Sequence, residues 1–159
     1  MSPAREEALA LYGNKLRVRV CGILIENDQL LLVKHQAILE NGCFWAPPGG
    51  GLQVGEGMVE ALQREFYEET HLRISVGKLL FVNEFLRLPL HAVELFFEVH
   101  RNQGEAQLGT DPELKHQLME SVAWLSWEQI STLQANEKHR LFAHCEQVAD
   151  ILQLSGFLS

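Results

Sequence analysis

Three glutamates near the middle of the chain are spaced so that they can act together. Glu65, Glu68 and Glu69 are three or four residues apart, and on a helix turning about 100° per residue they share a sector roughly 100° wide. Like charges at this spacing repel one another, and Mg²⁺ or Mn²⁺ removes the repulsion because these ions prefer carboxylate oxygens. The pattern fits a divalent-cation site, but on its own it is also typical of a solvated acidic helix face.

A glycine-rich turn and an arginine support this interpretation. Residues 49–51 are three glycines directly upstream of the acidic segment, and bare backbone allows a metal or phosphate to approach closely. Arg64 is expected on a different side of the helix from the three carboxylates, together with Glu60 and Glu56. It would then brace the junction of loop and helix and leave the carboxylates free.

The elements that must position these residues follow from hydrophobic periodicity. Val59, Leu62 and Phe66 recur at helical spacing, which predicts a helix from Glu56 to about His71 with this stripe facing the core. Ser126 with Gln129 forms a capping box for a short helix. A second helix near the C-terminus is predicted from an apolar stripe at Leu141, Cys145, Val148 and Leu152.

Alternating and apolar runs predict the strands. Residues 16–25 and 29–34 are expected to form a hairpin across Asn27 and Asp28. Residues 35–55 and 101–112 are expected to be loops, and the remaining strands are predicted at 73–86, 91–100 and 120–125. This order favours one domain over residues 1–159, of mixed α/β or α+β class, built as a sandwich with a mixed β-sheet.

Composition excludes several classes of protein. Asp and Glu outnumber Lys and Arg 21 to 13, giving a net charge of −8, which argues against binding long nucleic acids or an anionic membrane. Half of that excess lies in residues 56–69, where five glutamates oppose one arginine for a net charge of −4. No apolar run is long enough to span a bilayer. The three cysteines form no CxxC pair, so free thiols and a cytoplasmic location are expected.

Residues 50–72 resemble the Nudix box, written GX5EX7REUXEEXGU with U a bulky apolar residue. The matching positions are Gly50, Glu56, Arg64, Glu65, Phe66, Glu68, Glu69 and Leu72. His71 stands where the family has a glycine that ends the helix in a left-handed conformation, which histidine adopts at some cost. The resemblance extends over roughly residues 16–135 and implies a Nudix-like α/β/α sandwich in which the box forms a loop and a helix.

The resemblance also implies an activity. Nudix proteins mostly hydrolyse the pyrophosphate bond of a nucleoside diphosphate linked to another moiety, X, with Mg²⁺ or Mn²⁺ bound by the box. The implied metal ligands are Glu65, Glu68, Glu69 and the carbonyl of Gly50. The implied catalytic residues are Glu65, Glu68 and Arg64; which glutamate is the general base stays open, and Arg64 is expected to form a structural pair with Glu56.

Residues outside the box complete the predicted site. Relatives often supply a further acid, for which Glu113 and Glu120 are candidates, Asp111 is a weaker one, and a solvated loop acid is the alternative. Glu84 and Glu94 lie in predicted strands, where one of them could face a ligand. Six residues are predicted substrate contacts, although each could instead be a core aromatic or a surface base: Arg17, Arg19, Lys34, His35, Phe44 and Trp45.

Two other functions stay open at this point. A non-catalytic module that senses a nucleotide would keep the fold, but the intact acids of the box argue against it. Isomerisation of an isoprenoid diphosphate is a third possibility, which Cys43 leaves open. A homodimer is also possible, since the apolar stripe of the C-terminal helix could pack within the chain or across an interface.

Overall fold

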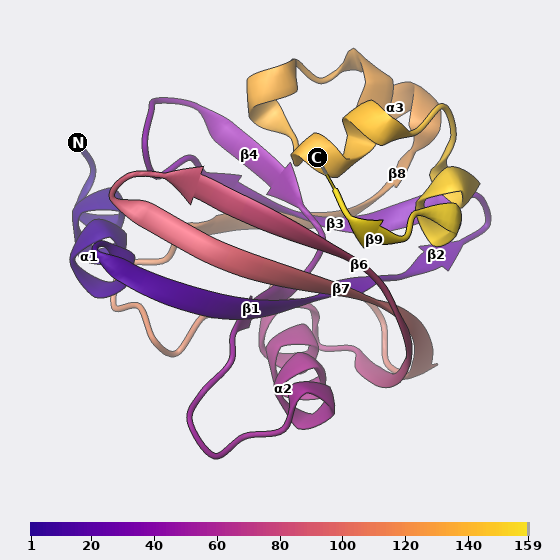
Figure 1. Cartoon of the computed structure of the whole chain (residues 1–159), viewed down its shortest axis with the longest axis horizontal. Helices are drawn as coiled ribbons and strands as arrows, with labels where there is room; N and C mark the ends of the chain where they lie inside the picture. Colours follow the sequence, from indigo (N-terminus) through magenta and orange to yellow (C-terminus); the bar gives the residue numbers. More distant parts are fainter. Residues whose placement is uncertain (159) are drawn as a thin grey trace.

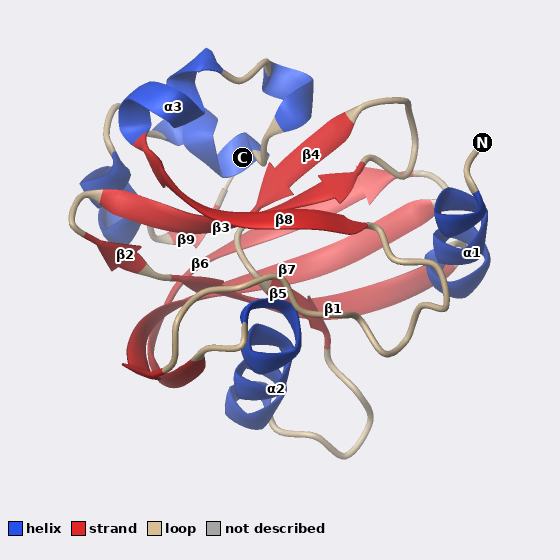
Figure 2. Cartoon of the chain, turned by 180° about the vertical axis from the view of Figure 1, so that it is seen from behind, coloured by secondary structure: helices blue, strands red, loops and turns tan. Residues whose placement is uncertain are grey.

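The computed structural model describes residues 1–158, in which two β-sheets lie between helical segments (Figure 1, Figure 2). The elements in chain order are α1 (Pro3–Tyr12), β1 (Lys15–Ile23), β2 (Ile25–Glu26), β3 (Gln29–Gln36), β4 (Cys43–Ala46), β5 (Gly49–Gly51), α2 (Met58–Thr70), β6 (Arg73–Arg87), β7 (Leu90–Gln103), β8 (Met119–Ser126), α3 (Trp127–Thr132), the 3₁₀ segments η1 (Ala135–Glu137), η2 (Arg140–His144) and η3 (Val148–Gln153), and β9 (Gly156–Phe157). Within these residues no helix is both long and apolar enough to span a membrane.

The larger sheet has the strand order β5-β1-β7-β6-β9 and is mixed, because β1 runs parallel to β7 but antiparallel to β5. In the smaller sheet β3 is central and pairs antiparallel with β2, β4 and β8. Helix α2 lies on one side of the sheets, and α3 with the 3₁₀ segments lies on the other (Figure 1). The predicted mixed α+β sandwich is confirmed.

The predicted hairpin of residues 16–25 with 29–34 is wrong for most of its length. Only Ile25 and Glu26 pair with β3, across a turn in which Asn27 and Asp28 both have positive φ. Strand β1 belongs to the other sheet, where it pairs with β5 and β7. The apolar run from Val20 to Leu24 is buried throughout, as expected for a segment that passes between two packed layers.

The N-terminal helix α1 is not among the predicted elements, although its start carries a recognisable signal. The Ser2 hydroxyl accepts a hydrogen bond from the Arg5 N–H (3.3 Å), and Pro3 occupies the first turn. The predicted loop 35–55 also contains β4 and β5, which are too short to show a period. Strand β5 pairs with β1 and strand β4 pairs with β3, and both of these partner strands are long enough to show a period.

The predicted C-terminal helix is wrong as a single element. Two 3₁₀ segments, η2 and η3, replace it, and Cys145 between them is extended. Asp150 explains the break, because its Oδ2 accepts hydrogen bonds from the N–H groups of Glu146 and Gln147 and so begins a new turn. Leu141 and Val148 are nevertheless buried, in the core that lies between this segment and the larger sheet.

Helix α2 packs through a slightly different stripe from the predicted one. Leu62 and Phe66 are fully buried, in a cluster that includes Val20 and Val99 of the sheet. Val59 is 49% exposed, so its predicted place in the core is wrong. It lies in the first turn of α2, and the buried residue before Leu62 is Ala61.

Helix α2 ends at the position where the Nudix box has glycine. His71 has φ 61° and ψ 15°, the left-handed conformation, and its N–H donates to the carbonyl of Tyr67 (2.9 Å). The histidine therefore supplies the same C-cap geometry as the expected glycine, at the steric cost of a Cβ in this region.

Replacing His71 with glycine is expected to stabilise the protein. His71→Gly relieves the left-handed strain and should raise the free energy of unfolding by about 0.5–1 kcal/mol, measured by urea denaturation. His71→Ala is the matched control, because it also removes the imidazole but keeps the Cβ. If both variants are equally stable, the left-handed conformation at residue 71 carries no measurable strain.

Candidate active site

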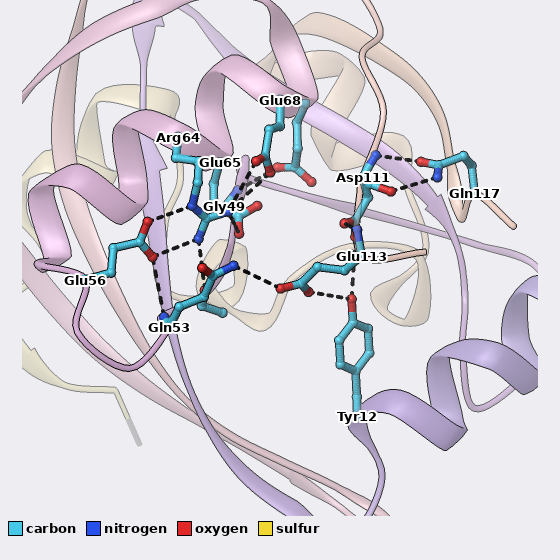
Figure 3. Close-up of polar contacts among 12 residues, drawn as sticks. Tyr12, Gly49, Gln53, Glu56, Arg64, Glu65, Glu68, Asp111, Glu113 and Gln117 are labelled. Carbon is cyan, nitrogen blue, oxygen red and sulfur yellow. Dashed lines mark hydrogen bonds and ion pairs between the residues drawn. The ribbon is translucent and has the colours of Figure 1, made fainter. Parts of the chain in front are cut away.

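The glycine strand β5 lies against the acidic end of α2. The Gly49 N–H donates to Oε1 of Glu69 (2.8 Å; Figure 3). A Cβ added to Gly50 would overlap the carboxylate of Glu65, so this carboxylate can lie here only because residue 50 is glycine. As predicted, bare backbone approaches the acidic helix. Gly50 lies beside Glu65, and both are predicted metal ligands.

Burial gives the three box carboxylates unusual electrostatics. Glu65 and Glu69 are 7% and 6% exposed, and Glu68 is half-buried. Desolvation raises the pKa of Glu65 to about 7 and also raises the pKa of Glu68. Desolvation, followed by the nearby charge of Glu65, raises the pKa of Glu69 well above its usual value. A bound cation would favour the charged form of all three groups.

Arg64 does not leave these carboxylates free, contrary to the prediction. Its Nε and Nη2 donate to the carboxylate of Glu56 (2.7 and 2.9 Å), which confirms that pair. Its Nη1 also donates to Glu65 (2.9 Å) and Glu68 (3.2 Å), because its long side chain reaches back across the helix face. Within residues 1–158 no three acidic, histidine or cysteine side chains converge on one point, and Arg64 Nη1 bridges two of the glutamates instead.

A distant loop is attached to the C-terminal end of α2 by its backbone. The N–H groups of Gln107, Gly109 and Thr110 donate to the carbonyls of Thr70, Glu69 and Glu68, at 3.0, 2.9 and 3.0 Å respectively. These carbonyls are the ones that a helix end leaves without partners. A Cβ at Gly109 would overlap the Glu68 carbonyl, so a side chain here would displace the loop.

This attachment brings a fourth carboxylate to the cluster. Asp111 follows the attached residues, and its charge contributes to the raised pKa of Glu65, Glu68 and Glu69. The Asp111 backbone is fixed in turn by Gln117, whose side chain accepts from its N–H (2.6 Å) and donates to its carbonyl (2.8 Å; Figure 3). The weaker of the predicted extra acids is therefore the one whose charge acts on all three box glutamates.

Of the other two candidate acids, Glu113 lines the cleft and Glu120 does not. Glu113 follows Asp111, lines the same cleft and accepts from the Gln53 side chain (3.4 Å). Glu120 lies on β8 and pairs with Lys34 (3.5 Å) away from the cleft. Glu84 pairs with His91 (2.9 Å), and neither joins the box carboxylates.

A cleft of about 390 Å³ runs from the box carboxylates between the two sheets to the 3₁₀ segments. Four of the six predicted substrate contacts line it: Arg17, Arg19, His35 and Phe44. Lys34 and Trp45 do not, because neighbouring residues of a strand point to opposite faces. Lys34 faces Glu120, and Trp45 packs against the core.

The two cleft arginines differ in what they bind. Arg19 donates to the buried carboxylate of Glu94 (2.6 Å). No acidic group in residues 1–158 forms an ion pair with Arg17, whose guanidinium lies 3.8 Å from the centre of the Tyr12 ring. Burial, and then the charge of Arg19, lowers the pKa of Arg17. Arg17 is thus a cleft cation that is available to an anionic ligand.

Glu94 is a structural acid at the floor of the cleft. Its Oε1 accepts from Asn83 Nδ2 (2.9 Å) and from His139 Nε2 (2.8 Å), and His139 Nδ1 accepts the Leu141 N–H (3.0 Å). His139 therefore carries its proton on Nε2. Burial raises the pKa of Glu94, but the bond from His139 and the charge of Arg19 outweigh it and lower the pKa to about 2. Glu94 connects the sheet to the C-terminal segment.

The comparisons with known proteins agree with this geometry. The family model of the NUDIX domain matches residues 15–145. The chain belongs to the NUDIX family. It is 31% identical over 133 residues to the nucleoside triphosphatase NudI of Enterobacter sp. (strain 638), covering 79% of this chain and 92% of that protein. It is 38% identical over 96 residues to an ADP-ribose pyrophosphatase of Methanocaldococcus jannaschii, covering 59% of this chain and 56% of that one.

Solved structures share the fold. A NUDIX hydrolase from Nitrosomonas europaea superposes with a TM-score of 0.70 at 20% identity, covering 87% of this chain and 89% of that one. With this family and these relatives, the chain is a Nudix pyrophosphohydrolase, an enzyme that cleaves a pyrophosphate bond. That favours hydrolysis over the non-catalytic sensing module. Nudix hydrolases generally use divalent metal ions.

Gly109→Ala is expected to impair activity through the loop attachment. The added Cβ cannot coexist with the Glu68 carbonyl, so the loop must move and carry Asp111 away from α2. We expect kcat to fall about ten-fold or more, measured by release of monophosphate. Gly57→Ala is the control, because a Cβ at Gly57 meets open space. Equal turnover in both variants would show that the attachment does not position the site.

Proposed function

We propose that the chain hydrolyses the pyrophosphate bond of a small nucleoside diphosphate derivative, using Mg²⁺ or Mn²⁺. Glu65, Glu68, Glu69 and the Gly50 carbonyl would hold the ion, with Asp111 as the acid from outside the box. The observation that carries this proposal is that Glu65 and Glu69 of α2 and Asp111 of the loop after Gly109 line the same cleft, with Glu68 near enough for the charge of Asp111 to raise its pKa. Such a donor set fits a hard divalent cation.

The ion and the side chains would divide the chemistry. A bound divalent ion neutralises the pyrophosphate and polarises its P–O bonds. Glu65 lines the cleft and Glu68 does not, which favours Glu65 as the group that takes a proton from the attacking water. Arg64 would orient Glu65 and Glu68 through the bonds it makes to both, while Glu56 fixes Arg64 from the loop.

The cleft suits a small substrate rather than a polymer. Its volume of about 390 Å³ lies in the range of small-molecule pockets, and the net charge of −8 disfavours long nucleic acids. Arg17 would bind a substrate phosphate because it has no acidic partner. His35 and Phe44 would contact the moiety X, and Arg19 would act indirectly through Glu94. The nucleoside triphosphatase and ADP-ribose pyrophosphatase relatives suggest which substrates to try first.

We propose one domain over residues 1–159, since α1 and the C-terminal segment pack on the same sheets and loops as the family-matched region. A cytoplasmic location fits the three free cysteines. The apolar stripe at Leu141, Cys145, Val148 and Leu152 packs largely in the chain's own core. A homodimer is still proposed, but this stripe would not form its interface.

Glu69→Gln tests the proposed function most simply. Removing this buried charge should lower metal-dependent turnover roughly 100-fold or more, because the ion loses a ligand. Nucleoside triphosphates, ADP-ribose, dinucleotide polyphosphates and nucleotide sugars should be assayed with Mg²⁺ and with Mn²⁺. Circular dichroism would verify that the variant keeps its fold.

Glu60→Gln is the matched control, since Glu60 is an exposed glutamate of the same helix. It should retain wild-type turnover. Turnover that persists in Glu69→Gln, or that is unaffected by a chelator, would refute the proposal.

A further inference from the structure

We infer that helix α1, which precedes the segment matched by the family model, is part of the active site, and that Tyr12 is a positioning residue for Asp111. The inference rests on the proposed function, because it concerns how that site is held together. It goes beyond the box and the loop acids, since residues 1–14 lie outside the match. Three sets of contacts support it.

The apolar face of α1 packs against the loop that carries Asp111. Ala4, Ala8 and Tyr12 recur every four residues and form one buried cluster with Leu114 and Leu118. Both leucines also line the cleft. The two leucines thus contact α1 on one side and line the cleft on another, so α1 supports this part of the cleft wall from outside.

Polar bonds fix the same loop to α1. The Glu7 carboxylate accepts hydrogen bonds from the N–H groups of Lys115 (2.5 Å) and His116 (2.8 Å). It also contacts Nδ1 of His116 (2.9 Å). Two backbone donors on one carboxylate hold a loop at a defined distance and angle. The loop is therefore attached at both ends, to α2 through residues 107–110 and to α1 through Glu7.

A second cleft loop is attached to α1 as well. Arg5 is almost fully buried, and it donates from Nε to the carbonyl of Ile38 (3.0 Å) and from Nη1 to Asn41 (2.9 Å). Ile38 lines the cleft on the side of β3. Helix α1 consequently connects two loops that come from opposite parts of the sequence and border the same cavity.

Tyr12 makes the contact that reaches the acids. Its hydroxyl lies 3.4 Å from Oδ2 of Asp111 and 3.4 Å from Oε2 of Glu113 (Figure 3). The hydroxyl has one proton, so it donates to one carboxylate at a time and lies between two groups that would otherwise repel. The other oxygen of Asp111 accepts the Glu113 N–H (2.9 Å). Tyr12 is thus the side chain that orients the free oxygen of Asp111.

The ring and the hydroxyl of Tyr12 have separable roles. The ring packs against the leucines and lies under Arg17, while the hydroxyl alone faces the acids. Tyr12→Phe therefore keeps the packing and the arginine contact and removes only the contacts of the hydroxyl with Asp111 and Glu113. The substitution separates a positioning role from a structural one.

The test measures Mn²⁺ binding directly, by electron paramagnetic resonance of the free ion, together with kcat and KM. Tyr12→Phe should raise the Mn²⁺ dissociation constant about ten-fold and lower kcat by a similar factor, with KM changed less than about two-fold. The urea midpoint should stay at the wild-type value. Tyr67→Phe is the control: Tyr67 is the other tyrosine of the chain and is 45% exposed on α2.

A double-mutant cycle shows whether Tyr12 acts through Asp111. In an Asp111→Asn background, Tyr12→Phe should cause almost no further loss of Mn²⁺ affinity. Losses that add fully, or a Tyr12→Phe variant that binds Mn²⁺ as the wild type does, would overturn the inference. If the wild type itself binds no Mn²⁺ and Glu69→Gln equals Glu60→Gln, the proposed function fails first, and this inference fails with it.

Discussion

Mutual repulsion among buried carboxylates is the constraint on which this site depends. Glu65, Glu68 and Glu69 share the C-terminal half of one helix with Asp111 nearby, and the burial of Glu65 and Glu69 weakens the screening of their charges by water. Desolvation, followed by the charges of Glu68 and Asp111, raises the pKa of Glu65 from its ordinary 4.5 to about 7. A carboxyl group with a raised pKa in the folded state makes the metal-free protein less stable as the pH rises through that interval. The metal-free protein therefore loses stability because of these carboxylates, and a bound cation would remove that loss.

The backbone around the carboxylates is arranged to hold them close. Gly50 lets β5 approach the Glu65 carboxylate of α2, and Gly109 lets the distant loop reach the last carbonyls of the helix. At Gly50 a side chain would displace the carboxylate, and at Gly109 it would displace the loop. Gly49 lets β5 lie against β1, while its N–H donates to Glu69. Within residues 1–158, Arg64 supplies the one positive charge that contacts the box glutamates directly, and it connects them to Glu56 in the preceding loop. Sheet, helix and loop therefore meet at the carboxylates.

Sequence reasoning identifies the parts whose signals are local. The helix of residues 58–70, its acids and its link to Glu56 follow from periodicity and from the fixed spacing of the box, and the structure has all of them. Even the substitution of His71 for glycine leaves the end of the helix unchanged, because histidine accepts the left-handed conformation. The mixed fold class follows from the alternation of strand and helix patterns.

Long-range pairing and side-chain reach are what the sequence does not encode locally. Nothing in residues 16–25 indicates that β1 pairs with β7, some 75 residues later along the chain. Helical angles place Arg64 away from the cluster, but a flexible guanidinium reaches Glu65 and Glu68 all the same. The role of Asp111 depends on three backbone bonds from a polar loop. The role of Tyr12 depends on the packing of α1 against that loop, which the capping signal of the helix does not reveal. Neighbouring residues of a strand point to opposite faces. This rule could have predicted that only one of Lys34 and His35, and only one of Phe44 and Trp45, faces the cleft.

The most direct measurement is the number of protons released when Mn²⁺ binds to the chelator-treated protein near pH 6.5. Isothermal titration in two buffers of different ionisation enthalpy gives this number. Burial raises the pKa of Glu65 to about 7 and also raises the pKa of Glu69. Because a cation binds the charged carboxylates, we expect release of about one proton per ion, with affinity rising as the pH increases. Binding without proton release, or no binding at millimolar Mn²⁺, would contradict it.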